Sequence, residues 1–254
     1  MKSIRHFLLY LPWTLWCLLT LAVIMIIAFP VLACFIYSGN RTLIRKAHDI
    51  PPTFARVLLF FWGIRIREHH PERQQAAGQF IFVSNHMSYL DAFIAAVTIP
   101  NYLKFLGKAE VLQYPVFGFV LKHLYVPVQR DDKGNRAWSM EQMKEKMKDG
   151  GSMFICPEGT CNVTGELLAH FHDGAFKLAI QTQTPLTPLT FIGTGDILPR
   201  SLLFIKPGLV HVYWHNPISS TTFSMENLED FKQEVKRIMK ADLEKHYPSG
   251  RYSV

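Results

Sequence analysis

The sequence predicts an α/β fold, with a largely parallel mixed sheet flanked by helices and an N-terminal apolar helical segment that associates with a membrane. From residue 80 onward, short apolar runs alternate with stretches of helical period, which is typical of βαβ units. Before that, residues 6–40 contain no Asp, Glu, Lys or Arg. We therefore divide the chain into a membrane-anchoring, interfacial helical segment at 1–70 and an α/β domain at 71–254.

The composition narrows the class of protein. The chain is 49% hydrophobic and carries a formal net charge of +7, which suits an anionic membrane surface or an anionic substrate. Nucleic acid would also suit this charge, but no aromatic-basic interleaving or recognition motif supports it. The four cysteines form no disulfide framework, so a reducing interior is expected.

The charge-free N-terminal run favours a membrane anchor. It exceeds the roughly 20 apolar residues that a bilayer-spanning helix needs. A cleaved signal peptide competes with this interpretation, but its apolar region normally has only about 7–15 residues. A third possibility is a helix pair that enters and leaves the same face, broken near Pro12 or Pro30. Basic residues flank the run on both sides, so they do not indicate which end of the anchor faces the cytoplasm.

The stretch Phe54–Ile66, "FARVLLFFWGIRI", is short and apolar, with Arg56 and Arg65 near its ends and Arg67 just after it. It predicts a helix that lies on a membrane surface, although an ordinary buried helix fits the pattern equally well.

The α/β domain shows strands and helices in alternation. The expected helices lie at 89–97, 116–123, 136–147, 174–181 and 225–244. Because sites in parallel sheets gather where strands end, the polar loops after Val83 and Cys156 are the candidates. The expected strands are Phe80–Val83, Tyr125–Val128, Met153–Cys156, Leu186–Ile192 and Leu209–Trp214.

The loop after Val83 contains His86 and, five residues later, Asp91. In a structural interpretation, Ser88 caps a helix and Asp91 completes a Ser-x-x-Asp capping box. In a functional interpretation, Asp91 bonds one imidazole nitrogen of His86 and leaves the other free as a general base. The two interpretations are compatible, and the spacing alone is a weak signal.

Two further loops have residues suited to anion binding. In "FICPEGTCNVTGEL", Gly159 and Thr160 offer donors, and Glu158 suits a hydroxyl or a basic partner, although an ordinary turn is the simpler interpretation. In "VPVQR", Arg130 follows an apolar strand and would make a bidentate phosphate ligand, although this stretch alone favours a solvated arginine beside Asp131 and Asp132. The stretch 105–124 lines an apolar groove or forms a core helix.

A metal site is not expected. Cys156, Cys161, His170 and His172 lie close in sequence, but Cys-x4-Cys with His-x-His fits zinc spacing poorly.

Taken together, "NHMSYLD", "GKAEVLQYPVFG", "VPVQR", "CPEGT" and "TPLTPL" resemble, in order and spacing, the motifs of the glycerolipid acyltransferases. The resemblance covers roughly residues 80–215 and is strongest to the 1-acyl-sn-glycerol-3-phosphate acyltransferases. It implies a membrane-bound enzyme that transfers a fatty acyl group from acyl-CoA or acyl-carrier protein to the free hydroxyl of 1-acyl-glycerol-3-phosphate, giving phosphatidic acid. No metal or other cofactor is implied.

The resemblance also implies roles for individual residues. His86 would be the general base and Asp91 its orienting acid. The predicted acyl-donor or pocket residues are Lys108, Lys177 and Pro188, of which Pro188 belongs to the fourth motif. The glycerol phosphate would be held by Arg130, Glu158, Gly159 and Thr160.

One position departs from the family pattern. The third motif usually ends in arginine, whereas this chain has Cys161, which removes a positive charge from the presumed phosphate pocket. Another lyso-lipid acceptor, such as a lyso-ornithine lipid, is therefore an alternative, as is a non-catalytic membrane lipid-binding protein. We expect the inner, cytoplasmic membrane, with the catalytic domain on the cytosolic side facing a soluble acyl donor.

Overall fold

The computed structural model describes residues 2–74, 77–108, 125–128, 133–199 and 204–249, and the chain forms two compact units. The first, here the helical unit, comprises Met1–Arg67, Met87–Thr98 and Gly193–His211. The second, here the sheet unit, comprises Glu68–His86, Ile99–Ile192 and Val212–Val254. Both units are assembled from separated segments of the chain, and the functional division predicted at residue 70 stays a prediction.

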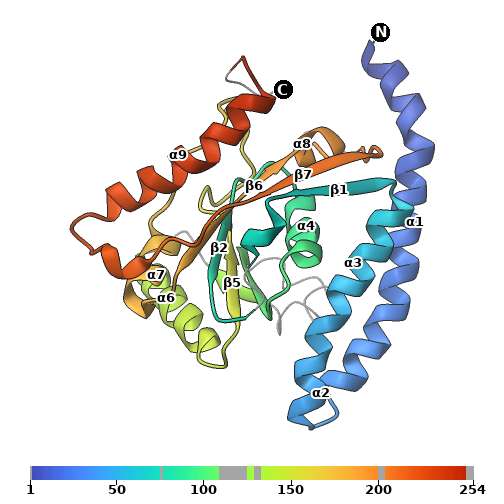
Figure 1. The fold of residues 1–254 in the computed structure, drawn as a ribbon. Coiled ribbons are helices and arrows are strands. Elements are labelled where there is room, and N and C mark those ends of the chain that lie inside the picture. The colour runs from blue at the N-terminus through green and yellow to red at the C-terminus, as the bar shows by residue number, and fades with distance from the viewer. Residues whose placement is uncertain (1, 75–76, 109–124, 129–132, 200–203, 250–254) are drawn as a thin grey trace. The chain divides into compact units, whose positions relative to one another are not determined.

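The helical unit begins with α1 (Lys2–Ile36), which continues through both Pro12 and Pro30. The possible helix pair broken at these prolines is therefore wrong, and α1 pairs instead with a later helix. The chain turns at Gly39, whose φ of +69° suits a residue without a Cβ, and the Asn40 side chain accepts the N–H of Thr42 at the start of α2 (Arg41–Lys46). A short 3₁₀ turn, η1 (Ala47–Asp49), leads into α3 (Ile50–Phe61), which lies beside α1 (Figure 1).

Hydrogen bonds between α1 and the end of α3 hold this pair together. The Trp62 indole N–H lies 3.1 Å from both the Cys17 carbonyl and the Thr20 hydroxyl, and the Trp16 indole donates to the Phe61 carbonyl at 3.0 Å. The helix predicted at 54–66 thus ends at Phe61. Gly63, with a φ of +62°, turns the chain into a strand that the sequence analysis missed.

The helix pair exposes many large apolar side chains. Within the described residues, one helix, over Tyr10–Ile36, is long and apolar enough to cross a membrane, with a mean hydropathy of 2.8. On α3, Phe60 is 78% exposed, although Leu58 and Leu59 are buried. The other exposed apolar residues of the pair include Leu15, Leu18, Leu19, Val23, Ile26, Ile27, Val31, Val57 and Phe61.

The strands described form one seven-stranded sheet in the order β1-β7-β6-β2-β5-β3-β4. The pairings β6–β2, β2–β5, β5–β3 and β3–β4 are parallel, and an isolated antiparallel bridge joins Leu186 to Ile218. The predicted α/β class is confirmed, but β1 and β3 were missed. The strands are β1 (Ile64–His69), β2 (Ile81–Ser84), β3 (Leu103–Lys108), β4 (Tyr125–Val128), β5 (Ser152–Ile155), β6 (Leu186–Ile192) and β7 (Gly208–Trp214).

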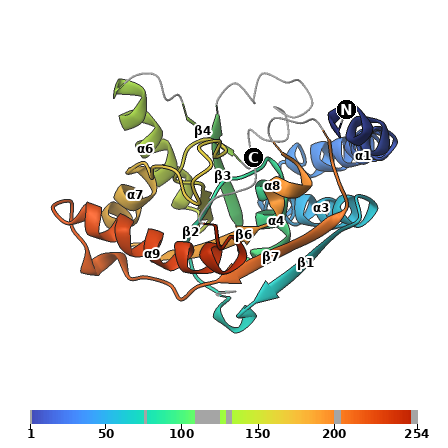
Figure 2. The same cartoon turned by 90° about the horizontal axis from the view of Figure 1, so that it is seen from above.

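Three helices of the sheet unit lie on one face of β2, β5 and β6 (Figure 2). They are α6 (Lys133–Met147), α7 (Gly174–Thr182) and α9 (Leu228–His246). Their apolar sides form one core with strand residues such as Val83 and Ile155. The helical unit also contains α4 (Leu90–Thr98) and α8 (Thr194–Ile197). Short 3₁₀ turns occur at η2 (Pro71–Arg73) and η4 (Ser220–Thr222), and the helix predicted at 116–123 lies outside the described residues.

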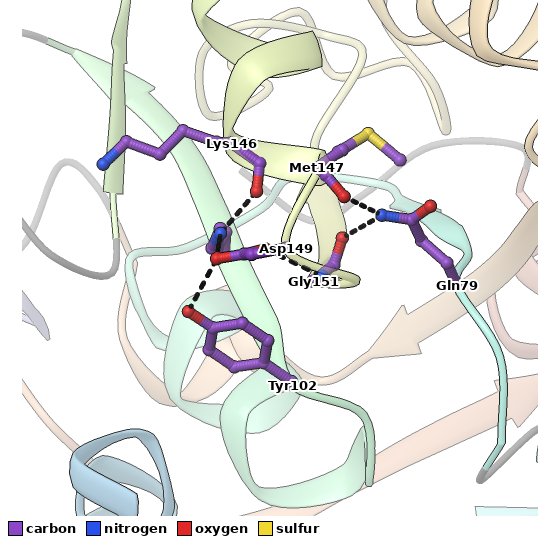
Figure 3. Close-up of polar contacts among 7 residues, drawn as sticks. Gln79, Tyr102, Lys146, Met147, Asp149 and Gly151 are labelled. Carbon is purple, nitrogen blue, oxygen red and sulfur yellow. Dashed lines mark hydrogen bonds and ion pairs between the residues drawn. The ribbon is translucent and has the colours of Figure 1, made fainter. Parts of the chain in front are cut away.

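The carboxyl end of α6 is tied to the sheet by polar side chains (Figure 3). The buried Lys104 ammonium donates to the carbonyl of Lys146 and to the carboxylate of Asp149. The Gln79 amide donates to the carbonyls of Met147 and Gly151. The bonds to the Lys146 and Met147 carbonyls satisfy groups that a helix end leaves without partners.

Candidate active site

The carboxyl ends of β2 and β5 lie side by side, because the two strands are parallel and Val83 pairs with Ile155. The loop after β2 and the loop after β5 therefore begin next to each other, as expected for a site in a parallel sheet. This juxtaposition was predicted from the polar residues that follow each strand. Pro188 of β6, predicted as a pocket residue, pairs with Val83 on the other side of β2.

The loop after β5 holds the main chain of His86 at both of its polar groups. Oε1 of Glu158 accepts the His86 N–H at 2.8 Å, and the Asn162 N–H donates to the His86 carbonyl at 2.7 Å. Oε2 of Glu158 accepts the Ala169 N–H at 2.9 Å. Glu158 thus lies beside His86, with main-chain partners that the sequence did not reveal, and its role as a ligand of the glycerol phosphate stays a prediction.

Asn85, the residue before His86, is fixed to β6 by its side chain. Its side-chain amide donates to the Phe191 carbonyl and accepts the Phe191 N–H, both at 2.8 Å, so that it pairs with β6 as another peptide would. No role in the site was predicted for Asn85 or Asn162 from the sequence. For Asn85 there was a signal, because a polar residue that directly follows an apolar strand must find partners if it is buried.

The imidazole of His86 contacts a thiol. Sγ of Cys161 lies 3.4 Å from Nε2 and 3.9 Å from Nδ1 of His86, and Cys161 is only 2% exposed. The residue that departs from the family pattern is therefore next to the predicted base. At this position the chain has a thiol in place of a guanidinium.

Asp91 forms the predicted capping box at the start of α4. Its Oδ2 accepts the N–H groups of Met87 and Ser88, both at 2.9 Å, and the Ser88 hydroxyl accepts the Leu90 N–H at 3.1 Å. The structural interpretation of Asp91 is thus confirmed. His86 belongs to the sheet unit and Asp91 to the helical unit, and their proposed pairing stays a prediction.

The other predicted phosphate ligands are only partly described. Gly159 has a φ of +73°, and its N–H closes a turn by donating to the Cys156 carbonyl at 3.0 Å. Thr160, the next residue of this loop, is exposed. Arg130 lies outside the described residues.

A cavity of about 980 Å³ opens between α6, α7 and the loop after β5. Cys156, Pro157 and Gly159 line its end near the loop, and Met143 contributes an apolar wall. Lys177, predicted as a pocket residue, lies in this lining. Lys108, predicted with it, ends β3.

The charged groups at this cavity are paired. The Lys177 ammonium lies 2.9 Å from Asp173, and Lys232 approaches the same carboxylate at 3.2 Å. The hydrogen bond from Lys177 is the main cause of a lowered pKa of Asp173. Among the described residues, no group of three or more His, Cys, Asp or Glu side chains is arranged to hold a metal ion.

Comparisons with known proteins identify the family of this chain. Residues 65–192 match the family model described as Acyltransferase. A chloroplastic 1-acyl-sn-glycerol-3-phosphate acyltransferase of Arabidopsis thaliana is 32% identical over 204 residues, covering 78% of this chain and 54% of that protein. A lyso-ornithine lipid O-acyltransferase of Pseudomonas aeruginosa is 26% identical over 211 residues, covering 75% of this chain and 80% of that protein. The chain belongs to the acyltransferase family.

The fold has a solved counterpart. The 1-acyl-sn-glycerophosphate acyltransferase PlsC from Thermotoga maritima superposes with a TM-score of 0.82 at 23% identity, with both chains covered completely. This similarity shows the same fold. The chain spans about half the length of the curated plant relatives it matches.

Proposed function

We propose that the protein is a membrane-bound 1-acylglycerol-3-phosphate O-acyltransferase. It transfers a fatty acyl group from acyl-CoA or acyl-carrier protein to the free hydroxyl of 1-acyl-glycerol-3-phosphate, giving phosphatidic acid. The observation that carries the proposal is the rigid placement of His86, whose main chain is bonded to Glu158 and Asn162 where two parallel strands end. Family membership and the names of the relatives support the substrate class.

In the proposed reaction, His86 takes the proton of the acceptor hydroxyl through one imidazole nitrogen. The resulting alkoxide attacks the thioester carbonyl, and the thiolate of the donor leaves with the proton that the imidazolium returns. Asp91 orients the ring and stabilises its charged form. No metal or other cofactor takes part in this sequence of steps.

The membrane contact is assigned to the helix pair α1–α3. A soluble domain would lose solubility with so many large apolar side chains exposed on two adjoining helices, whereas a lipid phase stabilises them. We place the enzyme at the inner, cytoplasmic membrane. Its catalytic domain faces the cytosol, where a soluble acyl donor is available.

Cys161 favours a second candidate acceptor. A phosphate beside His86 gains no cation from a thiol, and burying an unpaired charge is costly. A lyso-ornithine lipid has no phosphate and carries a free hydroxyl. The relative named as a lyso-ornithine lipid O-acyltransferase aligns with 75% of this chain. A non-catalytic lipid-binding protein on the same fold is the remaining alternative.

A direct assay separates these three functions. Purified full-length protein in detergent is given radiolabelled acyl-CoA with 1-acyl-glycerol-3-phosphate, lyso-ornithine lipid or a lysophospholipid with a choline headgroup. Labelled phosphatidic acid as the dominant product supports the proposal. Labelled ornithine lipid favours the second candidate, and acceptor binding without any labelled product favours the non-catalytic alternative.

A further inference from the structure

Glu158 is the one carboxylate of the loop after β5 that is almost completely buried, with 3% of its surface exposed. Both oxygens accept main-chain N–H groups, from His86 at 2.8 Å and from Ala169 at 2.9 Å. Hydrogen bonds from N–H groups to an ionised carboxylate are stronger than neutral ones, and they compensate the burial of its charge. Glu158 therefore links two loop segments by their backbones.

The bond to His86 belongs to a larger set that fixes this one residue. The carbonyl of His86 accepts the Asn162 N–H at 2.7 Å, and Asn85 makes two hydrogen bonds to Phe191 of β6. The peptide groups on both sides of the His86 Cα are thus held by the loop after β5, and the Asn85 side chain ties the preceding residue to β6. A side chain on so constrained a backbone is pre-organised, which is what a catalytic base requires.

The same geometry is unsuited to binding the acceptor. A carboxylate repels a phosphate, and the repulsion grows as burial lowers the local dielectric constant. To bind a hydroxyl by turning toward it, Glu158 would have to release a buried N–H group, which is unfavourable. The role implied by the family resemblance, a ligand of the glycerol phosphate, is therefore not the one its contacts favour.

We propose that Glu158 is a positioning residue, which holds the His86 backbone so that the imidazole meets the acceptor hydroxyl. This inference rests on the proposed function. It predicts that changes at Glu158 lower turnover while acceptor affinity is kept. A ligand of the acceptor would show the reverse.

The main test is Glu158→Gln in the full-length protein, with initial rates measured over a range of acceptor and donor concentrations. A glutamine has one acceptor oxygen, and its NH₂ group faces an N–H, so only one of the two bonds survives. We expect kcat to fall by about 10²-fold, because small displacements of a catalytic group have effects of this size. We expect the acceptor KM to stay within about twofold, since the substitution removes no contact between the enzyme and the bound acceptor.

Glu158→Asp keeps both oxygens but is one methylene shorter, and we expect intermediate turnover. The matched control is Glu234→Gln, which removes an exposed carboxylate paired with Arg237 on α9. Its kinetics should equal those of the wild type. Unfolding is monitored by circular dichroism, and rates are expressed per folded molecule, so that a purely structural role would leave kcat unchanged.

Hydrogen exchange gives an independent readout. In the wild type, the His86 amide should exchange more slowly than exposed loop amides, and Glu158→Gln should accelerate it selectively. Fast exchange of this amide in the wild type overturns the inference even if the variants do not fold. So does a raised acceptor KM with kcat preserved. An inactive wild type would instead refute the proposed function.

Discussion

Sγ of Cys161 lies 3.4 Å from Nε2 of His86, so a buried thiol occupies the space beside the proposed catalytic base. This distance suits a hydrogen bond between the thiol and the imidazole. An acceptor hydroxyl that approaches Nε2 must pass close to the sulfur. Any group added to that sulfur should therefore block the reaction.

We expect methyl methanethiosulfonate, a small thiol reagent, to inactivate the wild-type enzyme slowly and nearly completely. Bound acceptor should protect the enzyme, and Cys161→Ala should be active and resistant. Cys34→Ala, which removes an exposed cysteine, is the control and should be inactivated like the wild type. Equal inactivation of the Cys161→Ala variant would show that the contact has no influence on acyl transfer.

Asp91→Asn separates the two roles of this residue. An asparagine oxygen can still accept the N–H groups of Met87 and Ser88, because the single oxygen Oδ2 of Asp91 accepts both bonds. We therefore expect the unfolding temperature to stay nearly unchanged. Turnover should fall by roughly 10²–10⁴-fold, the usual contribution of general-base catalysis. Reduced stability with normal turnover would leave Asp91 with the capping role alone.

Much of the fold follows from local patterns, because β2, β4, β5 and β6 are apolar runs bounded by polar loops. Two strands, β1 and β3, were not predicted from the sequence, for identifiable reasons. In β1, arginines alternate with isoleucines directly after an apolar helix, so the strand looked like the end of that helix. In β3, the apolar residues continue into a longer apolar stretch, which hid where the strand ends.

The site was predictable in part for a similar reason. His86 and Glu158 are polar residues just after buried strands, and that pattern is visible in the sequence. The partners of Glu158 are main-chain N–H groups at positions 86 and 169. Because every residue except proline has a main-chain N–H, the residue types at these positions do not reveal the bonds. The same holds for Asn162, which acts through its own N–H.

The buried His215 should make stability depend on pH. Nε2 of His215 lies 3.0 Å from the Thr190 hydroxyl and 3.3 Å from the Asp242 carboxylate. Burial lowers the pKa of His215 to about 4, although Asp242 acts in the opposite direction. The folded protein thus binds this proton less readily than the unfolded chain, whose histidine has a pKa near 6.5.

The stabilising contribution of neutral His215 is accordingly complete above about pH 6.5 and is lost as the pH falls toward 4. A shift of this size corresponds to roughly 3 kcal/mol at most. Urea unfolding at several pH values measures it. We expect His215→Gln to be less stable at pH 7 and to lose less stability on acidification. An unchanged pH dependence in this variant would contradict the assignment.

Membrane binding should depend on the exposed apolar side chains of α1 and α3. Ile26→Lys and Phe60→Lys place charges at positions that are 72% and 78% exposed, so folding should be little affected. A charge within the bilayer costs up to roughly 3 kcal/mol, which corresponds to about a hundredfold weaker partition. Co-sedimentation with anionic lipid vesicles measures this.

Met225→Lys is the matched control, since Met225 is exposed in the sheet unit. It should bind vesicles like the wild type. If both helix variants also bind unchanged, the apolar surface of the helix pair does not contact the membrane.

The measurement closest to the central claim is the turnover of full-length His86→Ala with radiolabelled acyl-CoA and 1-acyl-glycerol-3-phosphate. His70→Ala, which removes an exposed histidine paired with Glu72, serves as the control. We expect phosphatidic acid formation to fall by about 10²–10⁴-fold in His86→Ala, with an unchanged circular dichroism spectrum and full activity in the control. Wild-type turnover by a folded His86→Ala protein would contradict the assignment of His86 as the base.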